Sequence, residues 1–202
     1  QLGFSMIFYF VQKLNYYKNY VDKQNWQKSD IFTHIDKPFF ELDNKRVGII
    51  GLGEIGRDFA KKAKAFNCEV VYYSTSGQNT NNEYKSVTLE QLLKTSDIIS
   101  IHAPLNSKTK DLLGYKELNL LKDGAILLNL GRGGIINEPD LARILDEKNI
   151  FCGLDVVSKE PIEESNPLLK VVNKQRLVMT PHIAWASVEA RTRLIEKVAK
   201  NI

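Results

Sequence analysis

Cysteine is scarce in this sequence, and its two cysteines stand far apart. Cys68 and Cys152 form no C-x-x-C pair among the 202 residues. A disulfide framework or a structural zinc site needs cysteine or histidine clusters at short spacing, so we expect neither, and no metal centre. A chain with two isolated thiols fits a reducing cytoplasm best.

Long apolar runs and an excess of one charge are also missing. The apolar residues 6–11 are too few to cross a bilayer, which needs about 20. They also lack the basic flank and cleavage site of a signal peptide. The 28 Lys and Arg are spread among 24 Asp and Glu, and the net charge is only +4. We therefore expect a soluble protein that binds neither a membrane nor a nucleic acid.

A glycine-rich turn, Gly51-Leu52-Gly53-Glu54-Ile55-Gly56, is the first sign of a ligand site. The pattern G-x-G-x-x-G is weak alone, but here it follows a β-prone run at 46–50 and precedes a helix-forming stretch at 58–66. That order predicts a dinucleotide-binding turn. The first glycine permits the turn, the second admits the pyrophosphate, and the third lets the helix lie close on the sheet. The helix N-terminus would hold the phosphates.

Beyond this unit, β-prone runs alternate with helical patterns. Strands are predicted at 69–73, 97–102, 125–130, 150–154 and 177–180, and helices at 88–93, 115–121 and 137–148. This alternation is typical of an α/β fold, a doubly wound parallel sheet of the Rossmann type. We divide the chain into an N-terminal helical segment with a linker (1–45), a Rossmann core (46–186) and a C-terminal helix (187–202).

The acidic residue that usually follows the second strand is absent. A carboxylate about 20 residues after the fingerprint normally binds the adenosine ribose. Residues 74–77 read Ser-Thr-Ser-Gly, and the next acid is Glu83. Ser74 then takes the place of the carboxylate and removes the charge that would repel a 2′-phosphate. Because no Arg or Lys stands beside it in the sequence, we expect NAD as the cofactor, with NADP tolerated or comparable.

Three residues far apart in the chain, Arg132, Glu160 and His182, suit redox chemistry on a 2-keto or 2-hydroxy acid. A guanidinium can grip the carboxylate and polarise the carbonyl of such an acid. The carbonyl oxygen needs a proton as hydride arrives, and histidine is the usual donor near neutral pH. A glutamate on the other ring nitrogen would orient the imidazole and favour its protonated form. Arg132, Asp155 and His182 follow predicted strands, where open α/β sheets bind ligands.

Several motifs occur in a fixed order and carry a family resemblance. After the fingerprint come Asn129-Leu130-Gly131-Arg132-Gly133, then Leu154-Asp155-Val156-Val157-Ser158-Lys159-Glu160-Pro161, then Thr180-Pro181-His182-Ile183-Ala184. With these motifs the chain resembles the nucleotide-binding domain of the D-isomer-specific 2-hydroxyacid dehydrogenases. The resemblance implies that Arg132, Glu160 and His182 are catalytic, that Asp155 contacts the nicotinamide carboxamide, and that His102 and Pro104 lie near the adenosine. The cofactor-binding residues it implies are Gly51, Gly53, Glu54, Ile55, Gly56, Ser74, His102, Ala103, Pro104, Leu130, Gly131, Arg132, Asp155 and His182.

Within that family, residues 72–77 and 180–186 are similar to glycerate dehydrogenases, also called hydroxypyruvate reductases. This implies hydride transfer between a nicotinamide cofactor and D-glycerate or hydroxypyruvate, with glyoxylate as a further substrate, in a cytoplasmic enzyme. The resemblance also suggests a homodimer joined through the aromatic and apolar segment 4–20. Roughly the first hundred residues of a typical member, most of its substrate domain, have no counterpart here, and the helix at 187–202 would lead back to that domain. These residues alone are expected to bind the dinucleotide and to turn over little substrate.

Two other functions fit the same residues. A dinucleotide-sensing dimeric scaffold of the corepressor type shares this fold and can keep the same Arg, Glu and His. No long polar tail or partner-binding linker is visible in the sequence, which favours an enzyme. Another enzyme of the same family, acting on phosphoglycerate, lactate or a branched 2-keto acid, also remains open, because the missing domain carries much of the substrate pocket.

Overall fold

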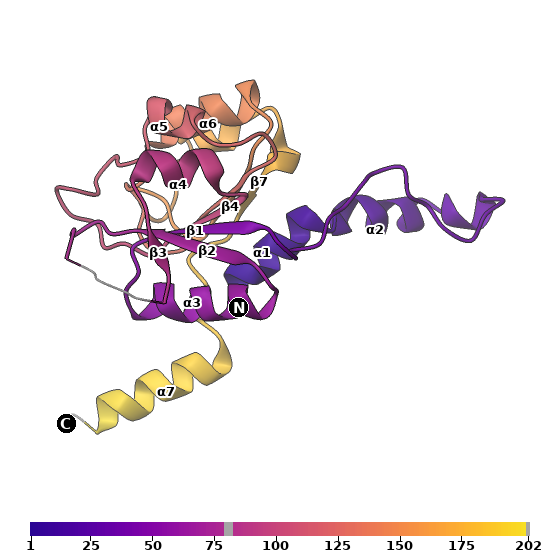
Figure 1. Ribbon diagram of the computed structural model, residues 1–202. Coiled ribbons are helices and arrows are strands. Elements are labelled where there is room, and N and C mark those ends of the chain that lie inside the picture. The colour runs from indigo at the N-terminus through magenta and orange to yellow at the C-terminus, as the bar shows by residue number, and fades with distance from the viewer. Residues whose placement is uncertain (79–82, 201–202) are drawn as a thin grey trace.

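A seven-stranded sheet forms the centre of the protein (Figure 1). The structure, a computed structural model, describes residues 1–78 and 83–200. Every neighbouring pair of strands is parallel, in the order β3-β2-β1-β4-β5-β6-β7. The predicted doubly wound parallel sheet is therefore confirmed. The strands are β1 (Arg46–Ile50), β2 (Glu69–Tyr73), β3 (Lys85–Ser86), β4 (Ile98–Ile101), β5 (Ile126–Asn129), β6 (Phe151–Leu154) and β7 (Leu177–Met179).

Helices cover both faces of the sheet. One face carries α4 (Leu89–Thr95), α5 (Tyr115–Asn119) and α6 (Glu138–Glu147), and the other carries α1 (Leu2–Val11) and α3 (Glu54–Ala65) (Figure 1). Successive residues of β1 serve opposite faces, because side chains alternate along a strand. Ile49 packs in the layer of α1 and α3, and Ile50 packs in the layer of α4 to α6. Both are fully buried, as expected of a parallel sheet covered on two sides.

The N-terminal segment divides into a packed part and an extended part. In α1, Met6, Ile7 and Phe10 are buried in the core beside α3. The next helix, α2 (Leu14–Asp22), buries no residue and extends away from the sheet with the chain that follows it (Figure 1). That extended arm, residues 23–41, contains the short 3-10 helix η1 (Trp26–Lys28). Thus α1 packs within this chain, and the apolar surface left open lies farther along.

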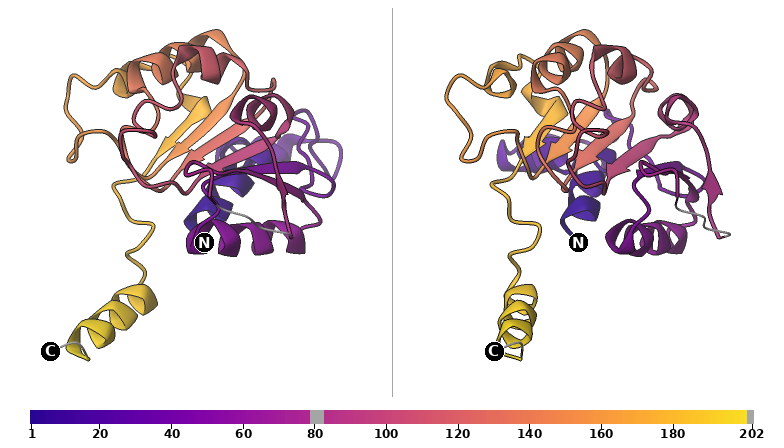
Figure 2. Two further views of the ribbon diagram at one scale, coloured as in Figure 1. Left: turned by 60° about the vertical axis from the view of Figure 1, so that its left-hand side comes forward. Right: turned by 90° about the vertical axis from the view of Figure 1, so that its left-hand side faces the viewer.

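The C-terminal helix α7 (Val188–Ala199) lies apart from the sheet in every view (Figures 1 and 2). The side chain of Ser187 caps it by accepting a hydrogen bond from the Ala190 amide. None of the twelve residues of α7 is buried. The helix predicted at 187–202 is present, and its last two residues lie outside the described part. Within that part, no helix is long and apolar enough to cross a membrane.

Helix α3 and strand β3 differ from the predicted elements. Helix α3, predicted from residue 58, starts at Glu54, inside the fingerprint, with Gly53 in an extended N-cap conformation. Residues 85–86 form the edge strand β3, which was not predicted because two residues carry no readable alternation. Two 3-10 helices, η2 (Pro167–Lys170) and η3 (Lys174–Arg176), connect β6 to β7.

Candidate active site

The carboxyl edge of the sheet gathers the predicted residues. Strand register aligns the last residues of six strands in one row, namely Tyr73, Ile50, Ile101, Asn129, Leu154 and Met179. The residues that follow them, Ser74, Gly51, His102, Leu130, Asp155 and Thr180, therefore lie along the same edge. This is where open α/β sheets bind ligands.

Each glycine of the fingerprint meets a different requirement of the turn. Gly51 has a φ of +90°, and a Cβ there would lie 2.9 Å from the backbone of Ala103. A Cβ at Gly56 would lie 2.4 Å from the carbonyl oxygen of Gly51, so α3 can approach the turn only through a glycine. A Cβ at Gly53 would meet nothing within 4 Å. Gly53 thus leaves open space before the N-terminus of α3, as a bound pyrophosphate requires.

One pocket joins this turn to the end of β2. It is lined by Gly51, Leu52, Gly53, Ser74, Thr75, Ser76, Gln78, His102, Pro104, Asn106, Ser107 and Lys108. The adenosine-end residues predicted from the resemblance therefore share one cavity with the glycine turn. Glu54 and Ile55 form the first turn of α3 beside it. Lys108 supplies a cation that the sequence did not place near Ser74, because the two residues lie on different loops.

His102 adds an uncharged ring to this pocket. Its Nε2 lies 2.9 Å from the hydroxyl of Ser100 on the same strand end. Burial lowers the pKa of His102 to about 4, because desolvation disfavours the imidazolium. The ring is therefore neutral at physiological pH. It does not balance the negative charge of a bound dinucleotide, which other groups must do.

The arginine loop follows β5 and is fixed by a buried asparagine. The Asn129 side chain donates to the carbonyl of Arg132 at 2.8 Å and accepts from the amide of Gly131 at 3.1 Å. The Arg132 guanidinium donates to the Gly131 carbonyl at 2.8 Å through Nη1. The side chain of Arg132 is exposed to the cavity beside β5 rather than buried in the core.

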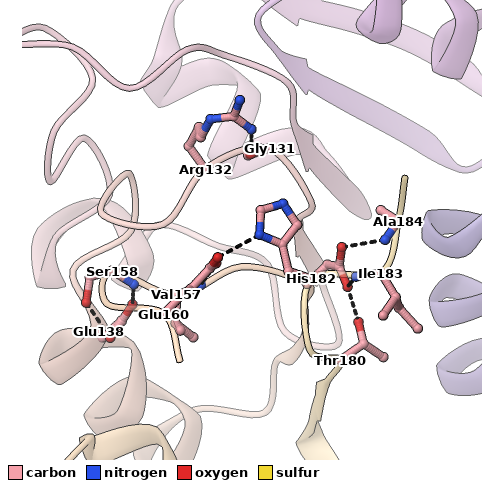
Figure 3. Close-up of polar contacts among 11 residues, drawn as sticks. Gly131, Arg132, Glu138, Val157, Ser158, Glu160, Thr180, His182, Ile183 and Ala184 are labelled. Atoms are coloured by element: carbon pink, nitrogen blue, oxygen red, sulfur yellow. Dashed lines mark hydrogen bonds and ion pairs between the residues drawn. The ribbon is translucent and has the colours of Figure 1, made fainter. Parts of the chain in front are cut away.

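Glu160 and His182 form a direct pair. Nδ1 of His182 lies 2.6 Å from Oε2 of Glu160, and Oε1 of Glu160 accepts from the amide of Val157 at 3.1 Å. A carboxylate can only accept, so Nδ1 donates and Nε2 is left on the other side of the ring. Figure 3 shows that other nitrogen on the side of the imidazole that faces Arg132. The side chains of His182 and Glu160 are 42% and 36% exposed, so both reach solvent.

The ionised form of Glu160 is favoured by its surroundings. Burial raises the pKa of the Glu160 carboxyl, but the hydrogen bonds from His182 and Val157 and the charges of His182 and Arg132 outweigh it. The pKa therefore lies below its ordinary value. An ionised Glu160 is what a partner to an imidazolium needs.

Asp155 anchors residues 180–184, the histidine loop, which follows β7 and carries His182. Its carboxylate accepts from the Thr180 hydroxyl at 2.5 Å, from the Ile183 amide at 2.8 Å and from the Ala184 amide at 2.7 Å. These donors stand on both sides of His182, which has a φ of +53°, a left-handed conformation. A residue with a Cβ is strained there. The buried carboxylate of Asp155 supplies the hydrogen bonds that hold it.

Arg132 and His182 line one cavity between α1, α3 and the histidine loop. His102, Leu130, Ile55 and Trp185 belong to the same cavity. His102 also lines the pocket at the glycine turn, so the two spaces adjoin. A ligand that spans both would run from Ser74 to His182. Among residues 1–78 and 83–200, no three His, Cys, Asp or Glu side chains gather as a metal site.

Glu138 and Lys108 are residues of this region that sequence reasoning missed. An acid in the first turn of a helix is ordinary, and the sequence contains no sign that Glu138 faces inward. Lys108 lies 34 residues after Ser74 (108 − 74 = 34). Only the fold brings such residues to the site.

Comparisons with known proteins agree on one family. Residues 4–184 match "D-isomer specific 2-hydroxyacid dehydrogenase, NAD binding domain". A glycerate dehydrogenase of Methylorubrum extorquens is 36% identical over 92% of this chain and 58% of its own length. A glyoxylate reductase of Thermococcus litoralis is also 36% identical, over 100% of this chain and 61% of its own length. The structure of an acyclic imino acid reductase in complex with NADPH and D-Arg superposes with a TM-score of 0.83 at 32% identity, over 98% of this chain and 61% of that one.

Proposed function

Since the chain belongs to the D-isomer-specific 2-hydroxyacid dehydrogenases, we propose that the protein is a nicotinamide-dependent reductase of hydroxypyruvate, with D-glycerate as product. The resemblance inferred from the motifs is confirmed at the level of the family. The chain spans 58% and 61% of the two curated relatives named above. The activity, the substrate and the partners of the whole protein are therefore part of the proposal.

One observation supports the chemistry above all: His182, which is paired with Glu160, lines the same cavity as Arg132, and Ile55 of the first turn of α3 lines it too. Arg132 binds the carboxylate of the keto acid and polarises its carbonyl. His182 holds a proton at Nε2 and delivers it to the carbonyl oxygen. Glu160 fixes the orientation of the ring through Nδ1.

The dinucleotide fits the residues that the structure brings together. Gly51, Gly53 and the first turn of α3 would hold its pyrophosphate, Ser74 its ribose, and the cavity of Arg132 and His182 its nicotinamide. When bound in reduced form, the nicotinamide supplies the hydride. Contact of Asp155 with the carboxamide remains a prediction, because the Asp155 carboxylate already accepts three hydrogen bonds from the histidine loop.

NAD is the proposed cofactor, with NADP as a comparable alternative. The missing ribose carboxylate lowers the barrier to a 2′-phosphate, and Lys108 places a cation in the same pocket. A structural relative was solved with NADPH. The ratio of catalytic efficiencies with NADH and NADPH decides the question, and a strong preference for NADPH contradicts the order proposed.

A homodimer and a cytoplasmic location complete the proposal. The sequence indicated an interface at residues 4–20, but Met6, Ile7 and Phe10 of that segment pack in the core, so we propose the extended arm in its place. The arm exposes Trp26, Ile31, Phe32, Ile35, Phe39 and Phe40. A monomer rarely leaves so much apolar surface open. Both cysteines are free and buried, which fits a reducing compartment.

The test is NADH oxidation by the full-length protein, followed by absorbance with hydroxypyruvate, glyoxylate, pyruvate and a branched 2-keto acid. We expect hydroxypyruvate to be the best substrate and His182→Ala to abolish its turnover while NADH still binds. Best turnover of another acid would reassign the substrate within the family. Tight NADH binding with no turnover of any acid would contradict the reductase and favour the dinucleotide-sensing scaffold.

A further inference from the structure

A buried carboxylate with no part in the chemistry above lies beside the site. Glu138 is the first residue of α6 and is only 7% exposed. Its oxygens accept from the Ser158 amide at 2.5 Å, the Ser158 hydroxyl at 2.9 Å and the Asn166 side-chain amide at 2.7 Å. A carboxylate removed from water needs such donors. The N-terminus of α6 also favours its negative charge.

All three donors belong to the loop that carries Glu160. Ser158 comes before Glu160 and Asn166 comes after it, so one carboxylate ties both ends of the segment 158–166 (Figure 3 shows the Ser158 end). Inside the segment, the Asn166 amide donates to the Glu163 carbonyl at 2.9 Å. Glu160 therefore cannot shift as part of this loop without disturbing the hydrogen bonds to Glu138.

The same carboxylate joins the glutamate loop to the arginine loop. Glu138 follows Arg132 by six positions (138 − 132 = 6). Between them, Gly133 packs directly on the other loop: a Cβ at Gly133 would lie 1.9 Å from the Val157 carbonyl oxygen. The loops touch through backbone atoms alone at this point. Hydrogen bonds to a charged acceptor are stronger than neutral ones, so Glu138 adds three such bonds to this backbone contact.

We propose that Glu138 is a positioning residue of the active site, which holds the Glu160 loop against the arginine loop and so aligns Glu160 with Nδ1 of His182. The inference rests on the proposed function, in which His182 delivers the proton. Glu138 lies outside the cavity that Arg132 and His182 line, so it acts through Glu160 and touches no substrate.

The first test is Glu138→Gln, which keeps the size of the side chain but turns an amide NH₂ toward the Ser158 amide or the Asn166 side-chain NH₂, which can only donate. We expect kcat on the preferred keto acid to fall about tenfold to a hundredfold, because a small misplacement of a catalytic pair has effects of that order. KM and NADH affinity should stay within about twofold, because Asn129 fixes the backbone around Arg132 without Glu138 and the glycine turn is a separate segment. Glu117→Gln is the matched control, because Glu117 accepts from the Gly114 amide at 3.2 Å, a hydrogen bond within the start of its own helix α5.

The second readout is independent of turnover. The chain has three histidines, so the NMR signal of the hydrogen-bonded Nδ1 proton of His182 can be assigned by its loss in His182→Gln. We expect the signal in the wild type and in Glu117→Gln, and its loss or broadening in Glu138→Gln. The Glu160 carboxyl should titrate at a higher pH in Glu138→Gln than in the wild type.

Ser158→Ala removes the hydroxyl donor and keeps the backbone amide. It should therefore lower kcat and weaken the Nδ1 proton signal, each by less than Glu138→Gln does. If Glu138→Gln does not fold, Ser158→Ala is the variant that tests the proposal. The proposal is overturned if Glu138→Gln folds and keeps both kcat and the Nδ1 signal. It is equally overturned if a folded Ser158→Ala leaves kcat and the signal unchanged. If the wild type binds NADH and turns over no keto acid, yet the signal disappears in Glu138→Gln, the reductase is refuted and the alignment stands.

Discussion

At the residue scale, His102 should make the free energy of unfolding fall as the pH drops from 6.5 toward 4. Its pKa in the folded chain is about 4, against 6.5 for an ordinary histidine, because of burial. Between these pH values the unfolded chain binds more protons, so the stability that His102 contributes is complete above pH 6.5 and falls as the pH drops toward 4. The loss by pH 4.5 is about 2 to 3 kcal/mol.

Urea unfolding at pH 7 and at pH 4.5, for the wild type and for His102→Gln, measures this loss. Glutamine does not titrate, so the variant should lose less free energy of unfolding than the wild type between the two pH values. Equal losses in the two proteins would show that the imidazole is not kept neutral by burial.

The candidate site was predictable where a residue belongs to a local motif. Arg132, Glu160 and His182 each follow the end of a strand within a short pattern, and the structure brings them together. Glu138 and Lys108 were missed because their importance arises only from contacts with distant loops. No local pattern encodes a contact between Glu138 and the segment 158–166, since it depends on how two loops pack.

At the scale of elements, substitutions at two glycines of the glycine turn should affect NADH affinity and the free energy of unfolding separately. Gly53→Ala adds a methyl group to open space, so the free energy of unfolding should change by less than about 1 kcal/mol. The methyl group occupies the approach of the pyrophosphate, and NADH affinity should fall about tenfold or more. Gly56→Ala is the contrasting variant, because its Cβ would meet the Gly51 carbonyl; it should destabilise the fold by about 1 to 3 kcal/mol.

Fluorescence titration with NADH and urea unfolding of both variants test this pair. A Gly53→Ala protein that binds NADH as well as the wild type would mean that the phosphates do not approach this turn.

The central strands were predictable because each is an apolar run between turn residues, and β2 was predicted with its observed ends. The edge strand β3 was not, because its two residues pair only through the register that β2 offers. The start of α3 was placed too late, at residue 58, because helix periodicity could not be read through the glycines. The packing of α1 on the sheet, beside an arm that leaves it, also required the fold.

At the scale of the whole molecule, the extended arm should decide the oligomeric state. Phe32 is 89% exposed, and it stands among five other exposed large apolar residues of the arm. Phe32→Lys should leave the fold of each chain intact and weaken a dimer, because a charge in an apolar interface is costly to desolvate. Light scattering during size-exclusion chromatography reports the mass. A wild type that is monomeric at micromolar concentration would contradict the dimer.

The 202-residue chain alone should bind the dinucleotide and turn over little or no keto acid. It contains the pocket at the glycine turn, but it spans only 58% and 61% of the glycerate dehydrogenase and the glyoxylate reductase named above. NADH titration and NADH oxidation on this chain, beside the full-length protein, give the comparison. Turnover by the chain equal to that of the full-length protein would show that these residues suffice.

The left-handed backbone at His182 lowers the stability of the fold at the residue that the proposed reaction needs. A glycine at this position would relieve about 1 to 2 kcal/mol of strain, since it tolerates a φ of +53° without a Cβ. A substitution that relieves strain at this position would therefore delete the proposed proton donor. Directed evolution that selected only for survival of heating could accept such a change, so any such campaign on this chain has to screen for turnover in every round.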